Sequence, residues 1–90
     1  MYGLVLLTKE RLEHIVMYHP DVKPYTKYFS RVLAHPERAT SSEKDSTVVI
    51  CYGPLPRRRV YLAVVVKTGM HPFILTAYLS KKPRRAILVP

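Results

Sequence analysis

Two apolar runs around a short turn constrain this chain more than any other feature. They cover Val60–Val66 and Phe73–Leu79, and Lys and Arg cluster outside them at 57–59 and 81–85. Both runs are rich in residues that favour strands, because β-branched and aromatic side chains pack well on a pleated surface. The segment 57–85 therefore predicts a β-hairpin with a basic cluster at each end.

The side chains of this hairpin alternate between two faces of different chemistry. The apolar face, which we expect to pack against helices, holds Val60, Leu62, Val64, Val66, Phe73, Leu75, Ala77 and Leu79. The other face holds Arg57, Arg59, Tyr61, Ala63, Val65, Lys67, Ile74, Thr76, Tyr78 and Ser80. Pairing Val66 with Phe73 keeps each set on one side, because a one-residue slip would turn one set over. This register places Tyr61 opposite Tyr78, away from the helices.

The first half of the chain predicts two helices. Thr8 is suited to be the N-cap of a helix over 9–18, and His19-Pro20 ends that helix because the residue before proline avoids the α region. A second helix is expected over 21–35, with apolar residues at helical spacing. The whole chain, 1–90, is then a single α+β domain, since 90 residues suffice for one core only.

The remaining segments complete a helical half over about 8–36 and a sheet half over about 47–90. The polar stretch Glu37–Ser46 is expected to be a surface loop, and Thr47–Tyr52 a strand. Ala86–Val89 is either a short edge strand or a tail, and the sequence leaves both open.

The net charge of +9 lies almost entirely in the second half of the chain. Residues 1–45 hold seven Lys and Arg against six acids, whereas residues 46–90 hold eight Lys and Arg and no acid. Such a surface attracts polyanions, so nucleic acid is the first partner to test. An anionic membrane, an acidic protein partner, or a role in solubility alone remain alternatives.

Other classes of site and location find little support in the sequence. Cys51 is the one cysteine, which excludes an intrachain disulfide and agrees with a cytoplasmic protein. No spacing of His and Cys suits zinc, so we expect no metal and no cofactor. The longest apolar run is far shorter than the roughly 20 residues of a membrane helix, so no membrane partner is expected.

RNA cleavage without a metal needs proton transfer to and from ribose oxygens, and charge stabilisation at the phosphate. His14 and His19 could transfer the protons, although each could equally be a surface or helix-end histidine. Tyr61 and Tyr78 could stack on unpaired bases, or could simply form a cross-strand aromatic pair.

Several short motifs extend this interpretation. Leu7-Thr8-x-x-Arg11-x-x-His14-Ile15, the following His19-Pro20, Lys67 at a strand end, and the run Phe73–Tyr78 stand in that order. Together they resemble the small phage- and mobile-element-associated nuclease domains of the barnase, EndoU, colicin and RelE-like group. The resemblance covers about residues 4–82.

The resemblance implies two N-terminal helices packed on one face of a roughly four-stranded antiparallel sheet. It also implies an RNase site on the open sheet face and the helix edge, with catalytic roles for His14, His19, Thr76 and Tyr78. Many relatives use a glutamate as base, and this chain has no Glu after residue 43.

We therefore expect a toxin-like, metal-independent endoribonuclease whose partners are RNA and an acidic antitoxin or inhibitor protein. The oligomeric state stays open. The expected nucleic-acid contacts are Arg57, Arg58, Arg59, Tyr61, Lys67, Lys81, Lys82, Arg84 and Arg85. The alternatives are an RNA- or DNA-binding module without catalysis, and an interaction protein that binds an acidic partner.

Overall fold

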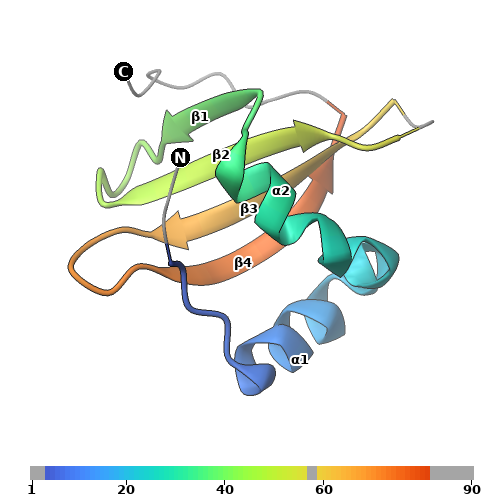
Figure 1. The fold of residues 1–90 in the computed structure, drawn as a ribbon, viewed down its shortest axis with the longest axis horizontal. Helices are drawn as coiled ribbons and strands as arrows, with labels where there is room; N and C mark the ends of the chain where they lie inside the picture. Colours follow the sequence, from blue (N-terminus) through green and yellow to red (C-terminus); the bar gives the residue numbers. More distant parts are fainter. Residues whose placement is uncertain (1–3, 57–58, 82–90) are drawn as a thin grey trace.

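A four-stranded antiparallel sheet with helices packed against it forms the protein (Figure 1). The computed structural model describes residues 4–56 and 59–81. Its elements are α1 (Lys9–Tyr18), the 3₁₀ helix η1 (Pro20–Tyr28), α2 (Phe29–Ala34), β1 (Arg38–Ser41), β2 (Val48–Pro54), β3 (Tyr61–Lys67) and β4 (Phe73–Ser80). The predicted α+β class is confirmed.

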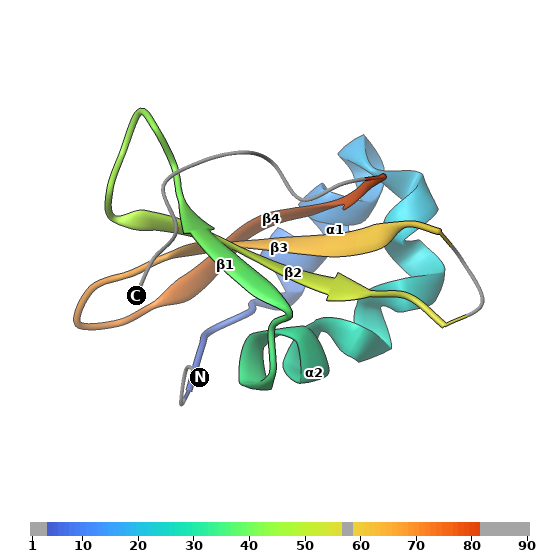
Figure 2. The same ribbon diagram turned by 90° about the horizontal axis from the view of Figure 1, so that it is seen from above.

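The strands follow one another in the order β1-β2-β3-β4, so each pairs with its neighbour in sequence. The helix α2 packs on β2 and β3, whereas α1 lies alongside β4 at the edge of the sheet (Figures 1 and 2). One edge strand is therefore covered by a helix. In the part of the chain that the structure describes, no helix has the length and apolar character needed to cross a membrane.

The helix α1 has the bounds that its sequence predicts. The Thr8 hydroxyl accepts a hydrogen bond from the Arg11 amide at 3.1 Å, which satisfies one of the free donors of the first turn. The helix ends at Tyr18, before His19 and Pro20. Ile15 is its buried residue and joins the helix to the core.

The second helix differs from its prediction. Residues 21–35 do not form one α-helix, because Pro20–Tyr28 is a 3₁₀ helix and only Phe29–Ala34 is α-helical. Pro24 lies within the first of these segments, and a proline inside an α-helix lacks an amide donor and clashes with the preceding turn. The short α2 nevertheless buries three side chains, Phe29, Val32 and Leu33.

The expected loop over 37–46 contains a strand, and the sheet half therefore begins before residue 47. β1 pairs with β2, with Ala39 opposite Cys51 and Thr40 opposite Ile50. Arg-Ala-Thr-Ser has weak strand propensity, so β1 depends on the hydrogen bonds that its neighbour offers. The predicted strand over 47–52 extends to Pro54. Residues 86–90, expected as a strand or a tail, lie outside the described residues.

The register of the hairpin is also different from its prediction. Lys67, rather than Val66, pairs with Phe73, and a bulge at Val65/Val66 leaves Leu75 without a partner in the register. A bulge moves the following side chains by one position. Ile74 is consequently buried on the helix side, and Leu75 packs on the other face, the reverse of the expected placement.

A second buried cluster occupies the face of the sheet away from the helices. Its members are Ile50, Tyr52, Ala63 and Val65, with Val48, Tyr61, Leu75 and Tyr78 packed against them. The expected open, polar face is thus apolar and buried at its centre. The hairpin alone did not show this, because β2 contributes Ile50 and Tyr52 to the same face.

Candidate functional site

A pocket between α1 and β4 brings sequence-distant polar residues together. Its volume is about 260 Å³, and it is lined by Arg11, His14, Ile15, Tyr18, Leu75 and Thr76. The four helix residues fall at i, i+3, i+4 and i+7, which places them on one stripe of α1. We call this pocket, with the neighbouring His19 and Tyr78, the α1–β4 site.

Arg11 provides the cationic group of the α1–β4 site. Its Nη1 donates a hydrogen bond to the Leu75 carbonyl at 3.5 Å. Leu75 is the residue that the β3–β4 register skips, so the cation lies at the irregular point of the edge strand. Arg11 belongs to a sequence motif, but the sequence predicts no role for it. Arg11 stands three residues before His14 and seven before Tyr18, and this helical spacing predicts that the three share one face of α1.

The two histidines of α1 reach the site in different ways. The rings of His14 and Tyr18, one turn apart, meet edge to face with centroids 5.2 Å apart. His19, which caps the C-terminus of α1, lies 6.3 Å from the ring of Tyr78 between centroids. His14 thus shares a pocket with Thr76, whereas His19 lies beside Tyr78, two positions further along β4.

Thr76 and Tyr78 lie on the same face of β4, because they are two positions apart in a strand. Thr76 pairs with Val65 and Tyr78 with Ala63. The four residues for which the sequence predicts catalytic roles, His14, His19, Thr76 and Tyr78, therefore gather at one edge of the sheet. Metal-free phosphodiester cleavage requires groups for proton transfer, for hydrogen bonding and for stabilising the phosphate charge. The site offers imidazoles, hydroxyls and a guanidinium for these three tasks.

The expected register, with Tyr61 opposite Tyr78, is wrong. Tyr61 lies opposite Ser80, and Tyr78 lies opposite Ala63. Tyr61 instead hydrogen-bonds the Glu37 carboxylate, and this bond together with the negative charge raises the pKa of the Tyr61 hydroxyl. Sequence reasoning missed Glu37 because it stands at the start of the segment expected to be a loop.

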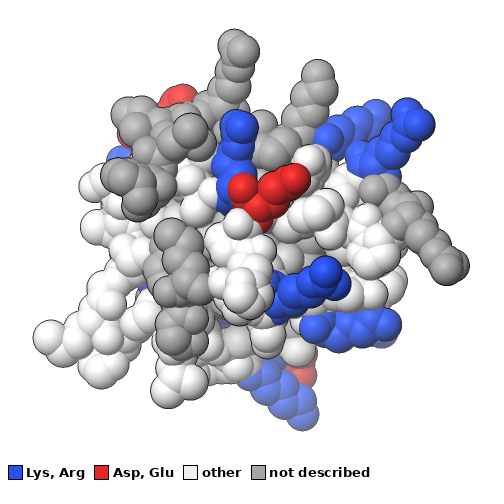
Figure 3. Space-filling model, turned by 45° about the horizontal axis from the view of Figure 1, so that its top comes forward, with Lys and Arg blue, Asp and Glu red and all other residues white. Residues whose placement is uncertain are grey.

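The predicted basic contacts are distributed unevenly. Lys67 Nζ contacts Asp45 Oδ2 at 2.8 Å and Thr47 Oγ1 at 2.6 Å, so an acid balances its charge. Arg59 and Lys81 are exposed, and Figure 3 shows Lys and Arg side chains spread over one face of the molecule. The other predicted contacts, Arg57, Arg58, Lys82, Arg84 and Arg85, lie outside the described residues.

Cys51 belongs to the core. It is fully buried between the helices and the sheet, and burial raises the pKa of its thiol to about 11. The thiol is therefore protonated at neutral pH and is a poor nucleophile. Among the described residues, no three side chains of His, Cys, Asp or Glu lie close enough to hold a metal ion.

Comparisons of the chain with protein-family models, with curated proteins and with solved structures find no match.

Proposed function

We propose that this protein is a metal-independent, toxin-like endoribonuclease whose reaction takes place at the α1–β4 site. One observation carries the proposal. His14 lines the same pocket as Arg11 and Thr76, and His19 contacts Tyr78, although α1 and β4 are more than 50 residues apart in sequence.

The proposed reaction transfers the phosphate within the RNA. One histidine removes the proton of a ribose 2′-hydroxyl, whose oxygen then forms a bond to the adjacent phosphorus. The bond from phosphorus to the 5′-oxygen breaks, and the second histidine protonates that leaving oxygen. The products are a 2′,3′-cyclic phosphate and a free 5′-hydroxyl.

The remaining residues of the site stabilise this reaction. Arg11 supplies positive charge where the phosphate becomes more negative, and the hydroxyls of Thr76 and Tyr78 orient the phosphate or the ribose by hydrogen bonds. The cationic second half of the chain supports RNA as the substrate, because it attracts the phosphate backbone irrespective of sequence.

The proposal is tested with labelled single-stranded RNA in EDTA. We expect the wild-type protein to cleave it. Substitution of His14 or His19 by Ala should lower the rate by about 100-fold or more, as for the loss of a general acid or base. Tyr78→Phe keeps the ring and removes the hydroxyl, so it separates hydrogen bonding from packing.

His71→Ala is the matched control, because His71 is exposed in the turn between β3 and β4. Its rate should equal that of the wild type. Histidine changes its protonation between about pH 5 and 9. Salt-sensitive RNA binding without cleavage across this range would reject the nuclease and support an RNA-binding module. Weak binding that does not respond to salt would instead support the acidic protein partner.

A further inference from the structure

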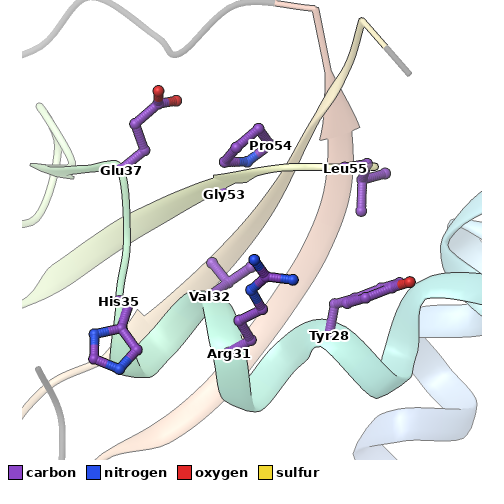
Figure 4. A pocket seen from close by; sticks show the side chains of 8 residues that line it. All are labelled: Tyr28, Arg31, Val32, His35, Glu37, Gly53, Pro54 and Leu55. Atoms are coloured by element: carbon purple, nitrogen blue, oxygen red, sulfur yellow. The ribbon is translucent and has the colours of Figure 1, made fainter. Parts of the chain in front are cut away.

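A second pocket opens between α2 and β2, away from the α1–β4 site (Figure 4). Its volume is about 270 Å³. Val32, Gly53 and Leu55 are buried and form its apolar floor. A Cβ on residue 53 would lie 2.6 Å from Val32 Cγ2, so the glycine allows α2 to approach β2 this closely.

The rim of this α2–β2 pocket is aromatic and cationic. Tyr28 and Arg31 line it, and Figure 4 shows the Arg31 side chain between Tyr28 and His35. Lys27 does not line the pocket, but its Nζ lies over the Tyr28 ring, 5.5 Å from the ring centre. Among the described residues, no acidic side chain forms an ion pair with Arg31 or Lys27.

The single acid of the rim does not neutralise these cations. Figure 4 shows the Glu37 side chain pointing away from Arg31, and its carboxylate is hydrogen-bonded by Tyr61. An aromatic ring beside a guanidinium over an apolar floor is suited to an unpaired base with its phosphate, because bases stack on aromatic rings and phosphates pair with arginine.

The helix η1 connects the two pockets. It begins directly after His19 of the α1–β4 site and ends at Tyr28 of the α2–β2 pocket. Nine residues of 3₁₀ helix span at most about 18 Å. At the 3.4 Å spacing of stacked bases, this corresponds to roughly five nucleotides. An RNA strand of this length is long enough to reach from His19 to Tyr28.

We propose that the α2–β2 pocket binds one unpaired nucleotide of the RNA whose phosphate is cleaved at the α1–β4 site. The base stacks on Tyr28 over the apolar floor, and Arg31 binds the phosphate. This inference rests on the proposed function and names its substrate as single-stranded RNA longer than about five nucleotides.

Binding is measured with 2′-O-methyl oligoribonucleotides, which lack the attacking hydroxyl and stay intact. A trimer and a decamer are compared on the wild type, Tyr28→Leu and Arg31→Gln. The leucine keeps the apolar packing of Tyr28 and removes its aromatic face. Lys44→Gln is the control, because Lys44 is an exposed lysine in the loop between β1 and β2.

We expect both pocket variants to bind the decamer about fivefold or more weakly than the wild type, and the trimer equally well. The control should bind both oligomers as the wild type does. A decamer with a single abasic site, moved along the strand, should lose affinity at one position in the wild type and at none in Tyr28→Leu.

Unchanged decamer affinity in both pocket variants would overturn this inference, while cleavage that depends on His14 and His19 would still support the nuclease. Conversely, a decamer affinity that depends on Tyr28 and Arg31, without any cleavage of unmodified RNA, would retain the pocket and reject the nuclease. The two failures are thus distinguishable.

Discussion

Two regions of the sheet hold a cation in opposite ways. At the end of β3, Lys67 is bound by the Asp45 carboxylate and the Thr47 hydroxyl, so its charge is balanced within the protein. At the α1–β4 site, Arg11 contacts the neutral carbonyl of Leu75. A neutral acceptor orients a guanidinium without cancelling its charge, which leaves that charge available to a phosphate. The position of a cation in the sequence therefore says little about whether its charge is available to a ligand.

The largest expected difference is in catalysis. Arg11→Gln keeps a hydrogen-bond donor and good helix propensity but removes the charge, so the single-turnover rate of RNA cleavage should fall by about 100-fold. Lys67→Gln should change this rate by less than about twofold, because Asp45 already balances Lys67. Equal losses in the two variants would contradict this difference between Arg11 and Lys67. Lys9→Gln in the first turn of α1 controls for charge alone.

A smaller difference is expected in the salt dependence of binding. For single-stranded nucleic acid, each phosphate contact contributes about 0.7 to the slope of log affinity against log salt concentration. Arg11→Gln should lower the magnitude of that slope by about 0.7, and Lys67→Gln should leave it unchanged. Fluorescence anisotropy with a 2′-O-methyl decamer measures both slopes. A smaller slope in Lys67→Gln would show that the ion pair with Asp45 opens when RNA binds.

The ion pair itself should contribute little to stability. The Lys67 and Asp45 side chains are 37% and 44% exposed, so water screens their attraction. Lys67→Gln and Asp45→Asn should each lower the melting temperature by less than about 5 °C. The melting temperature of the double variant should fall by no more than the larger of the two single-variant decreases. An additive loss would mean that the two side chains act independently.

The smallest effect concerns pH. Hydrogen bonds from Lys67 and then from Thr47, with the Lys67 charge, lower the pKa of Asp45 well below its ordinary value. A carboxyl whose pKa is lower in the folded state stabilises the fold above the unfolded pKa of about 3.9, and that stabilisation is lost as the pH falls. By carbon NMR, Asp45 should titrate at lower pH in the wild type than in Lys67→Gln. The same titration in both proteins would contradict the assignment.

Local signals were sufficient for part of the fold. Thr8 and Pro20 set the two ends of α1, because a cap and a helix-breaking residue act within one turn. The alternation of β3 placed Leu62, Val64 and Val66 on the helix side, where the structure has them. The sequence did not predict that His14 lies beside Thr76, since no local rule states which strand a helix accompanies.

Other features of the fold could not be predicted from the sequence, because their causes are not local. β1 forms from a segment of weak strand propensity, since the free edge of β2 supplies its hydrogen bonds. The bulge at Leu75 coincides with contacts from outside the hairpin, because Leu6 accepts from the Ile74 amide and donates to the Pro72 carbonyl. Glu37 is placed for its hydrogen bond with Tyr61 because β1, which follows it directly, pairs with the sheet.

Local patterns and composition were enough to predict the α+β class, the bounds of α1, and the excess of positive charge in the second half of the chain. Periodicity and capping act over a few residues, and composition does not depend on the fold. The register of the hairpin, the partner of Lys67 and the grouping of Arg11 with His14 and Thr76 are set by tertiary contacts. Those depend on which surfaces meet, and α1 and β4 meet across more than 50 residues of chain.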